Sequence, residues 1–122
     1  MKVCMIGTGY VGLVSGTCFA DIGHEVICVD NDATKIEILR RGGIPIYEPG
    51  LADLVRKNLQ NGRLTFTTSI DEGVRRSTVL FIAVGTPPGE TGEADLSHVL
   101  TAAEQVGRAI GRYTVIANKS TV

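Results

Sequence analysis

The 122-residue sequence predicts an α/β fold, in which helices cover both faces of a doubly wound parallel sheet. Two observations carry this prediction. Short apolar runs that suit strands alternate along the chain with stretches of helical periodicity. The run at 78–84, TVLFIAV, is almost entirely apolar, which is typical of a central parallel strand that is buried on both faces.

The first elements are a strand at about residues 2–6, a helix at about 10–22 and a strand at about 25–30. Small residues recur every four positions along the helix and would let it approach the sheet closely: Gly12, Gly16 and Ala20. An apolar stripe beside them is expected to pack into the core: Val14, Cys18 and Ile22.

Caps and breakers define the rest of the chain. Asn31 or Asp32 can cap a helix, two prolines exclude helix from 44–50, and Ser69 can cap a later helix. The elements expected after residue 30 are, in order, a helix at about 32–41, a helix at 51–60, a strand at 64–68, a helix at 69–76, a strand at 78–84, a helix at 96–110 and a strand at 113–118. Right-handed crossovers then predict the strand order 3-2-1-4-5.

Composition argues for one domain, spanning 1–122, and against several functional classes. The formal net charge is −1, so nothing electrostatic favours nucleic acid or a membrane as a partner. No apolar run approaches the length of a membrane span, and a cytoplasmic location is expected. No metal is expected, because His24 and His98 stand alone. Three cysteines are expected to be small buried residues in a reducing compartment: Cys4, Cys18 and Cys28.

The segment Gly7-Thr8-Gly9-Tyr10-Val11-Gly12 follows the first strand and opens the first helix. In this context the three glycines are typical of a Rossmann-type dinucleotide-binding unit. The first permits a tight turn, the second lets the backbone approach a diphosphate, and the third lets the helix pack close to the sheet. The free N–H groups at the helix start would then bind the phosphates.

Asp30 ends the second strand, where a carboxylate can accept hydrogen bonds from the adenosine ribose hydroxyls. It would repel a 2′-phosphate, so NAD is predicted as the cofactor rather than NADP. Lys35 lies one helical turn further along the chain and is near enough to reach the same ribose. The loops that contain Thr86 and Thr121 follow strands 4 and 5, open into the ligand crevice and are expected at the nicotinamide end.

Five segments, in this order, resemble the amino-terminal domain of the UDP-glucose/GDP-mannose dehydrogenase family, and the resemblance covers the whole chain. They are GTGYVGL at 7–13, CVD at 28–30 with Lys35-Ile36, PIYEPGL at 45–51, VGTP at 84–87 and KSTV at 119–122. Lys119 is more similar to the UDP-glucose branch, because arginine is usual there in the GDP-mannose branch.

The resemblance implies an oxidoreductase that oxidises the C6 hydroxyl of UDP-glucose to a carboxylate, giving UDP-glucuronate and reducing two NAD. Carried over by position, it implies that Val11 contacts the cofactor and that Thr86 and Thr121 line the nicotinamide end. Thr121 would also help to place a catalytic water. Tyr10 is counted with the cofactor-binding residues, which are therefore Gly7, Gly9, Tyr10, Val11, Gly12, Asp30, Lys35, Thr86 and Thr121.

The resemblance also implies that 1–122 is a truncated piece, inactive alone. The family's nucleophilic cysteine, its aspartate base, its central helix and its sugar-nucleotide-binding domain would lie beyond residue 122, and the complete protein is expected to be a homodimer or higher oligomer. Two alternatives stay open. One is the NAD-binding domain of another sugar-nucleotide dehydrogenase, acting on GDP-mannose or UDP-N-acetylmannosamine. The other is a nucleotide-sensing module that is not an enzyme.

Overall fold

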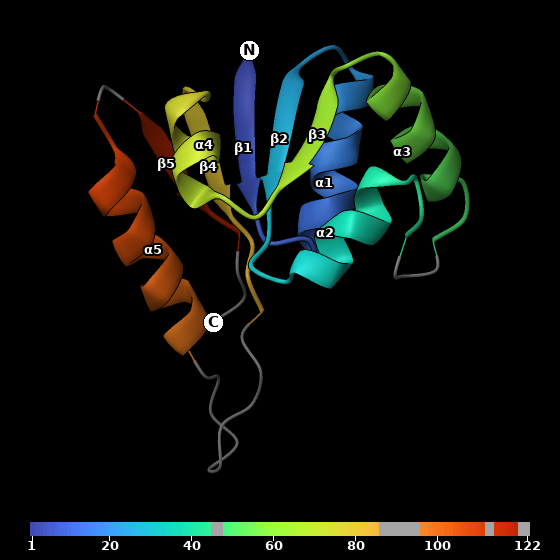
Figure 1. Cartoon of the computed structure of the whole chain (residues 1–122). Helices are drawn as coiled ribbons and strands as arrows, with labels where there is room; N and C mark the ends of the chain where they lie inside the picture. The colour runs from blue at the N-terminus through green and yellow to red at the C-terminus, as the bar shows by residue number, and fades with distance from the viewer. Residues whose placement is uncertain (45–47, 86–95, 112–113, 120–122) are drawn as a thin grey trace.

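The computed structural model describes residues 1–44, 48–85, 96–111 and 114–119. Its five parallel strands form one sheet in the order β3-β2-β1-β4-β5, which confirms the predicted order (Figure 1). The strands are β1 (Lys2–Ile6), β2 (Glu25–Val29), β3 (Leu64–Thr67), β4 (Val79–Ile82) and β5 (Val115–Asn118). The helices are α1 (Tyr10–Asp21), α2 (Ala33–Arg40), α3 (Leu51–Gln60), α4 (Ile70–Arg75) and α5 (Ser97–Ala109).

Helices cover both faces of the sheet, as predicted (Figure 1). On one face α1, α2 and α3 pack over a core that includes Met5, Leu39 and Phe66. On the other face α4 and α5 pack over a core that includes Cys4 and Leu80. The adjacent β1 residues Cys4 and Met5 therefore pack into the cores on opposite faces of the sheet, because successive side chains of a strand point to opposite faces.

The pairing register brings the carboxyl ends of the central strands to one level. Ile6 of β1 pairs with Val29 of β2 and with Ile82 of β4. The loops that leave these three strands consequently start side by side at one edge of the sheet. Doubly wound sheets bind their ligands at this edge, where the strand order reverses between β1 and β4.

Helix α1 packs closely on the sheet through its small residues, as predicted. A Cβ added at Gly16 would lie 2.9 Å from Sγ of Cys28, so only glycine fits at this contact. Of the neighbouring apolar stripe, Val14 is partly buried and packs against the core as predicted, but the prediction is wrong for Cys18 and Ile22. Cys18 is exposed and Ile22 is 72% exposed, whereas Leu13 is fully buried. At 3.6 residues per turn, positions 18 and 22 lie on the far side of the helix from the face that packs on the sheet.

Among the described residues, no helix has the length and apolar character that crossing a membrane requires. Within the same part of the chain, no three His, Cys, Asp or Glu side chains gather as metal ligands would. Cys4 and Cys28 are buried in the sheet as expected. Burial raises the pKa of the Cys4 thiol to about 12 and raises the pKa of Cys28 as well, so both thiols are protonated and poorly nucleophilic near neutral pH.

Candidate cofactor-binding site

A cavity of about 630 Å³ opens at the carboxyl ends of β1, β2 and β4. It lies between the glycine loop, the end of β2 and the first turns of α5, and its volume is in the range of cofactor pockets. The described residues that line it are Ile6, Gly7, Thr8, Gly9, Val29, Asp30, Asn31, Lys35, Thr68, Ile70, Ala83, Val84, Gly85, Ser97, His98, Thr101, Ala102 and Gln105.

Two glycines give the loop its shape. Gly7 has φ +107°, and a Cβ there would lie 2.5 Å from the carbonyl oxygen of Ala83 after β4. A Cβ at Gly12 would lie 1.9 Å from the carbonyl oxygen of Gly7, so helix and loop are in backbone contact. The N–H of Gly7 also donates to the carbonyl of Val29 at 2.7 Å, which ties the loop to the end of β2.

Gly9 has a different environment from the other two glycines of the loop. A Cβ built on Gly9 would meet no atom of the described residues within 4 Å, and the residue lines the cavity. Gly9 is also the N-cap of α1, with no side-chain cap and no acidic residue in the first helical turn. Backbone N–H groups and the positive end of the helix dipole therefore face open space beside a backbone without a side chain, an arrangement that fits a diphosphate.

Asp30 lies opposite the loop, and its carboxylate accepts three hydrogen bonds from described residues. Its Oδ2 accepts from the hydroxyl of Thr8 at 2.6 Å and from the N–H of Thr8 at 3.1 Å, and its Oδ1 accepts from the N–H of Asp32 at 3.0 Å. Nζ of Lys35 lies 3.7 Å from Oδ2. Lys35 therefore lies beside Asp30, and its contact with a ribose stays a prediction.

These contacts keep the Asp30 carboxylate ionised. Partial burial pushes its pKa up, but the hydrogen bonds from the Thr8 hydroxyl and from the N–H groups of Asp32 and Thr8, with the charge of Lys35, outweigh burial. The net result is a pKa below the ordinary value for an aspartate. A fixed negative charge therefore stands at the rim of the cavity at neutral pH.

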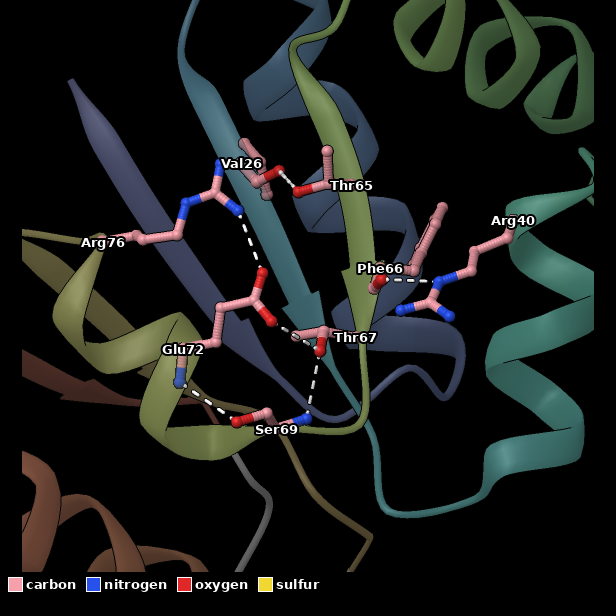
Figure 2. Close-up of polar contacts among 8 residues, drawn as sticks. All are labelled: Val26, Arg40, Thr65, Phe66, Thr67, Ser69, Glu72 and Arg76. Carbon is pink, nitrogen blue, oxygen red and sulfur yellow. Dashed lines mark hydrogen bonds and ion pairs between the residues drawn. The ribbon is translucent and has the colours of Figure 1, made fainter.

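The turn between β3 and α4 contributes Thr68 and Ile70 to the cavity lining. Figure 2 shows the polar contacts of this turn. Ser69 caps α4, as predicted, because its Oγ accepts from the N–H of Glu72 at 3.2 Å. The N–H of Ser69 donates to Oγ1 of Thr67, whose hydroxyl donates to the Glu72 carboxylate. These bonds fix the turn that brings Thr68 and Ile70 to the cavity.

The structure describes two of the remaining predicted site residues, Tyr10 and Val11, and does not describe the other two, Thr86 and Thr121. Tyr10 and Val11 are 55% and 42% exposed in the first turn of α1 and do not line the cavity, so their contact with a cofactor stays a prediction. The Tyr10 hydroxyl instead donates to Oε2 of Glu48 at 2.9 Å. Thr86 and Thr121 lie outside the described residues.

Several residues of the cavity were missed by sequence reasoning. Thr8 lies inside the glycine motif, but only the structure shows its hydroxyl on Asp30. The α5 residues Ser97, His98, Thr101 and Gln105 line the wall that faces the loop, and no local motif marks them. The described lining contains no cysteine, because Cys4 and Cys28 are buried in the sheet and Cys18 lies exposed on α1.

Comparisons with known proteins agree with this geometry. Residues 1–122 match the family model for the NAD binding domain of the UDP-glucose/GDP-mannose dehydrogenase family. The chain is 60% identical over 121 residues to UDP-glucose 6-dehydrogenase TuaD of Bacillus subtilis, covering 99% of the chain and 26% of that protein. It is 54% identical over 122 residues to UDP-glucose 6-dehydrogenase of Pseudomonas aeruginosa, covering 100% of the chain and 27% of that protein. The chain thus spans about a quarter of the length of these relatives.

Solved structures give the same result. A ternary complex of GDP-mannose dehydrogenase from Pseudomonas aeruginosa superposes with a TM-score of 0.97 at 41% identity, over 100% of this chain and 29% of that one. A UDP-glucose dehydrogenase from Pyrobaculum islandicum superposes with a TM-score of 0.95 at 44% identity, over 99% of this chain and 29% of that one.

Proposed function

The chain belongs to the UDP-glucose/GDP-mannose dehydrogenase family as its NAD-binding domain, and from this premise we propose that it is the cofactor-binding part of a UDP-glucose 6-dehydrogenase. In the complete protein the reaction would convert the C6 alcohol of UDP-glucose to the carboxylate of UDP-glucuronate. Two hydrides leave the substrate carbon, the second after addition of a nucleophile, and one water supplies the second carboxylate oxygen. Two NAD are reduced for each sugar oxidised.

The residues of the cavity fit the two polar ends of the adenosine diphosphate half of NAD. Gly9 and the start of α1 supply free N–H groups for the diphosphate. Asp30 supplies a carboxylate acceptor for the adenosine ribose, and Lys35 lies beside it as a donor. Bound NAD supplies a hydride acceptor, and this chain's own residues bind and orient it.

We infer that the nucleophile implied by the family resemblance lies outside this chain. The pKa of Cys4 and of Cys28 is raised by burial, and neither thiol reaches the cavity. Cys18 is exposed on α1 and does not line the cavity either. We therefore expect the isolated chain to bind NAD and to leave UDP-glucose unoxidised.

The observation that carries the proposal is the placement of Gly9 and of an ionised Asp30 in one cavity. Titration calorimetry of the chain with NAD and with NADP tests it. A 2′-phosphate beside Asp30 would meet a repulsion of about 1–4 kcal/mol at contact distance, so NADP should bind about tenfold more weakly or worse. Equal affinity for the two nucleotides would contradict the role given to Asp30.

A matched pair of variants sharpens the titration. Asp30→Asn should weaken NAD binding and remove most of the preference over NADP, because the amide is neutral and donates as well as accepts. Asp53→Asn removes a carboxylate from the exposed surface of α3, where it pairs with Arg56, and should leave both affinities unchanged. Equal effects of the two substitutions would mean that net charge, rather than the site, sets the preference.

The structural similarity to a GDP-mannose dehydrogenase, at a TM-score of 0.97, supports GDP-mannose as a second candidate substrate. Profiling the complete protein with UDP-glucose, GDP-mannose and UDP-N-acetylmannosamine decides between them. We expect UDP-glucose to be oxidised fastest, since the relatives named above at 54–60% identity are UDP-glucose 6-dehydrogenases. The cytoplasmic location and the homo-oligomeric state of the complete protein stay predictions, the second of which sedimentation analysis would test.

A further inference from the structure

Thr8 lies between the first two glycines of the loop and is fully buried. Its hydroxyl and its backbone N–H both donate to the same oxygen, Oδ2 of Asp30, at 2.6 and 3.1 Å. The two residues are 22 positions apart in sequence and sit at the ends of neighbouring strands. The contact therefore joins the turn that would hold the diphosphate to the carboxylate that would hold the ribose.

The Asp30 carboxylate has little freedom left. Its side chain is 14% exposed, and the N–H of Asp32 holds Oδ1 while Thr8 holds Oδ2. A carboxylate has about four lone-pair sites, of which these donors use three. With respect to the described residues the remaining site is on Oδ1, because both bonds from Thr8 end on Oδ2. The rotation of the carboxylate is thus fixed from both oxygens, and one acceptor position stays open for a ligand hydroxyl.

We propose that Thr8 is a positioning residue, whose hydroxyl fixes the Asp30 carboxylate and thereby sets the preference of the site for NAD over NADP. The inference rests on the proposed NAD-binding function. A carboxylate held in one orientation presents its open acceptor site to a ribose hydroxyl and cannot turn away from a 2′-phosphate. Without the hydroxyl, Oδ2 loses the shorter of its two bonds and keeps only the N–H of Thr8 at 3.1 Å, so the carboxylate is held less tightly in this orientation.

Three substitutions at position 8 separate the hydroxyl from the rest of the side chain. Thr8→Val keeps the shape and removes the hydroxyl, Thr8→Ala removes the hydroxyl without a branched side chain, and Thr8→Ser keeps the hydroxyl. Thermal unfolding of each chain shows which variants fold. If Thr8→Val does not fold, Thr8→Ala serves as the hydroxyl-free variant.

The first readout is NAD and NADP affinity by titration calorimetry. In the hydroxyl-free variant the ratio of NAD to NADP affinity should fall about tenfold, which corresponds to about 1.4 kcal/mol. Thr8→Ser should keep the ratio of the unmodified chain within about twofold, a difference below about 0.5 kcal/mol. A hydroxyl-free variant that folds and keeps the original ratio would overturn the proposal, as would a loss in Thr8→Ser equal to that in Thr8→Val.

The second readout needs no ligand. The pKa of Asp30, followed by carboxyl ¹³C NMR, should rise toward the ordinary aspartate value in the hydroxyl-free variant and stay low in Thr8→Ser. An unchanged pKa in a folded hydroxyl-free variant would overturn the coupling. If the unmodified chain binds no NAD, the proposed function fails and the selectivity role fails with it. An unchanged ratio in a chain that does bind NAD overturns the role of Thr8 alone.

Discussion

Gly9→Ala should separate ligand binding from folding. Gly9 has φ −72° and ψ −166°, an extended conformation that alanine adopts without strain. Within the part of the chain that the structure describes, the added Cβ would meet no atom within 4 Å. The folded state is therefore unaffected, while the unfolded chain loses conformational freedom, so the variant should be more stable by about 0.4–1 kcal/mol. For a chain of this length that is a rise in the unfolding midpoint of about 1–5 °C.

The same Cβ would project into the cavity that Gly9 lines. A methyl group there keeps a diphosphate from the N–H groups at the start of α1, so the affinity for NAD should fall at least about tenfold, or about 1.4 kcal/mol. Scanning calorimetry and titration calorimetry on one preparation give both numbers. The reasoning is refuted if the variant binds NAD as tightly as the unmodified chain, or if its midpoint falls by several degrees.

Two further glycines serve as controls. Gly107 is exposed in α5 and is not among the described residues that line the cavity, and a Cβ there would meet no described atom within 4 Å. Gly107→Ala should stabilise the helix by about 0.5–1 kcal/mol and leave NAD affinity unchanged. Gly12→Ala should lose the fold, because its Cβ would lie 1.9 Å from the carbonyl oxygen of Gly7. A Gly12→Ala variant more stable than the unmodified chain would contradict the close backbone contact between Gly12 of α1 and Gly7 of the loop.

Three other predictions concern stability. Leu39→Ala empties a fully buried site in the core beneath α2 and should lower the free energy of unfolding by about 2–5 kcal/mol in urea denaturation, and a loss below 1 kcal/mol would count against that packing. Ser69→Ala removes the cap of α4 and should cost about 1 kcal/mol, whereas Ser69→Asp should retain most of the stability. The pKa of Asp30 is lowered by folding, so its contribution is complete above the unfolded value of about 4 and is lost as the pH falls through the folded pKa. Acid titrations should accordingly show a shallower loss of stability below about pH 4 for Asp30→Asn than for the unmodified chain, and parallel curves would contradict the shift.

The strand order and the central residues of the candidate site could be predicted from the sequence. Apolar runs located the strands, the handedness of crossovers ordered them, and the structure has the order β3-β2-β1-β4-β5. The glycine loop and Asp30 were marked by a motif whose residue types have separate physical roles. Lys35 followed from helix geometry, because one turn into α2 returns a side chain to the end of β2.

What the sequence could not supply was side-chain direction and distant partners. Periodicity gave helix α1 but not its rotation about its own axis, so Cys18 and Ile22 were assigned to the core and are exposed. Thr8 occupies a variable position of the glycine motif, and the motif does not indicate that its hydroxyl donates to Asp30, 22 residues further along the chain. His98 and Gln105 reach the cavity only because α5 packs beside β4, and that placement is tertiary.

Strand β5 is an edge strand of the sheet, and its apolar side chains are only partly covered. Val115 and Ile116 are 46% and 48% exposed, and as neighbours along a strand they point to opposite faces. Covering the remaining half of each would add about 1 kcal/mol per side chain. Any further polypeptide that packs over β5 would therefore raise the melting temperature of the sheet above that of the isolated chain.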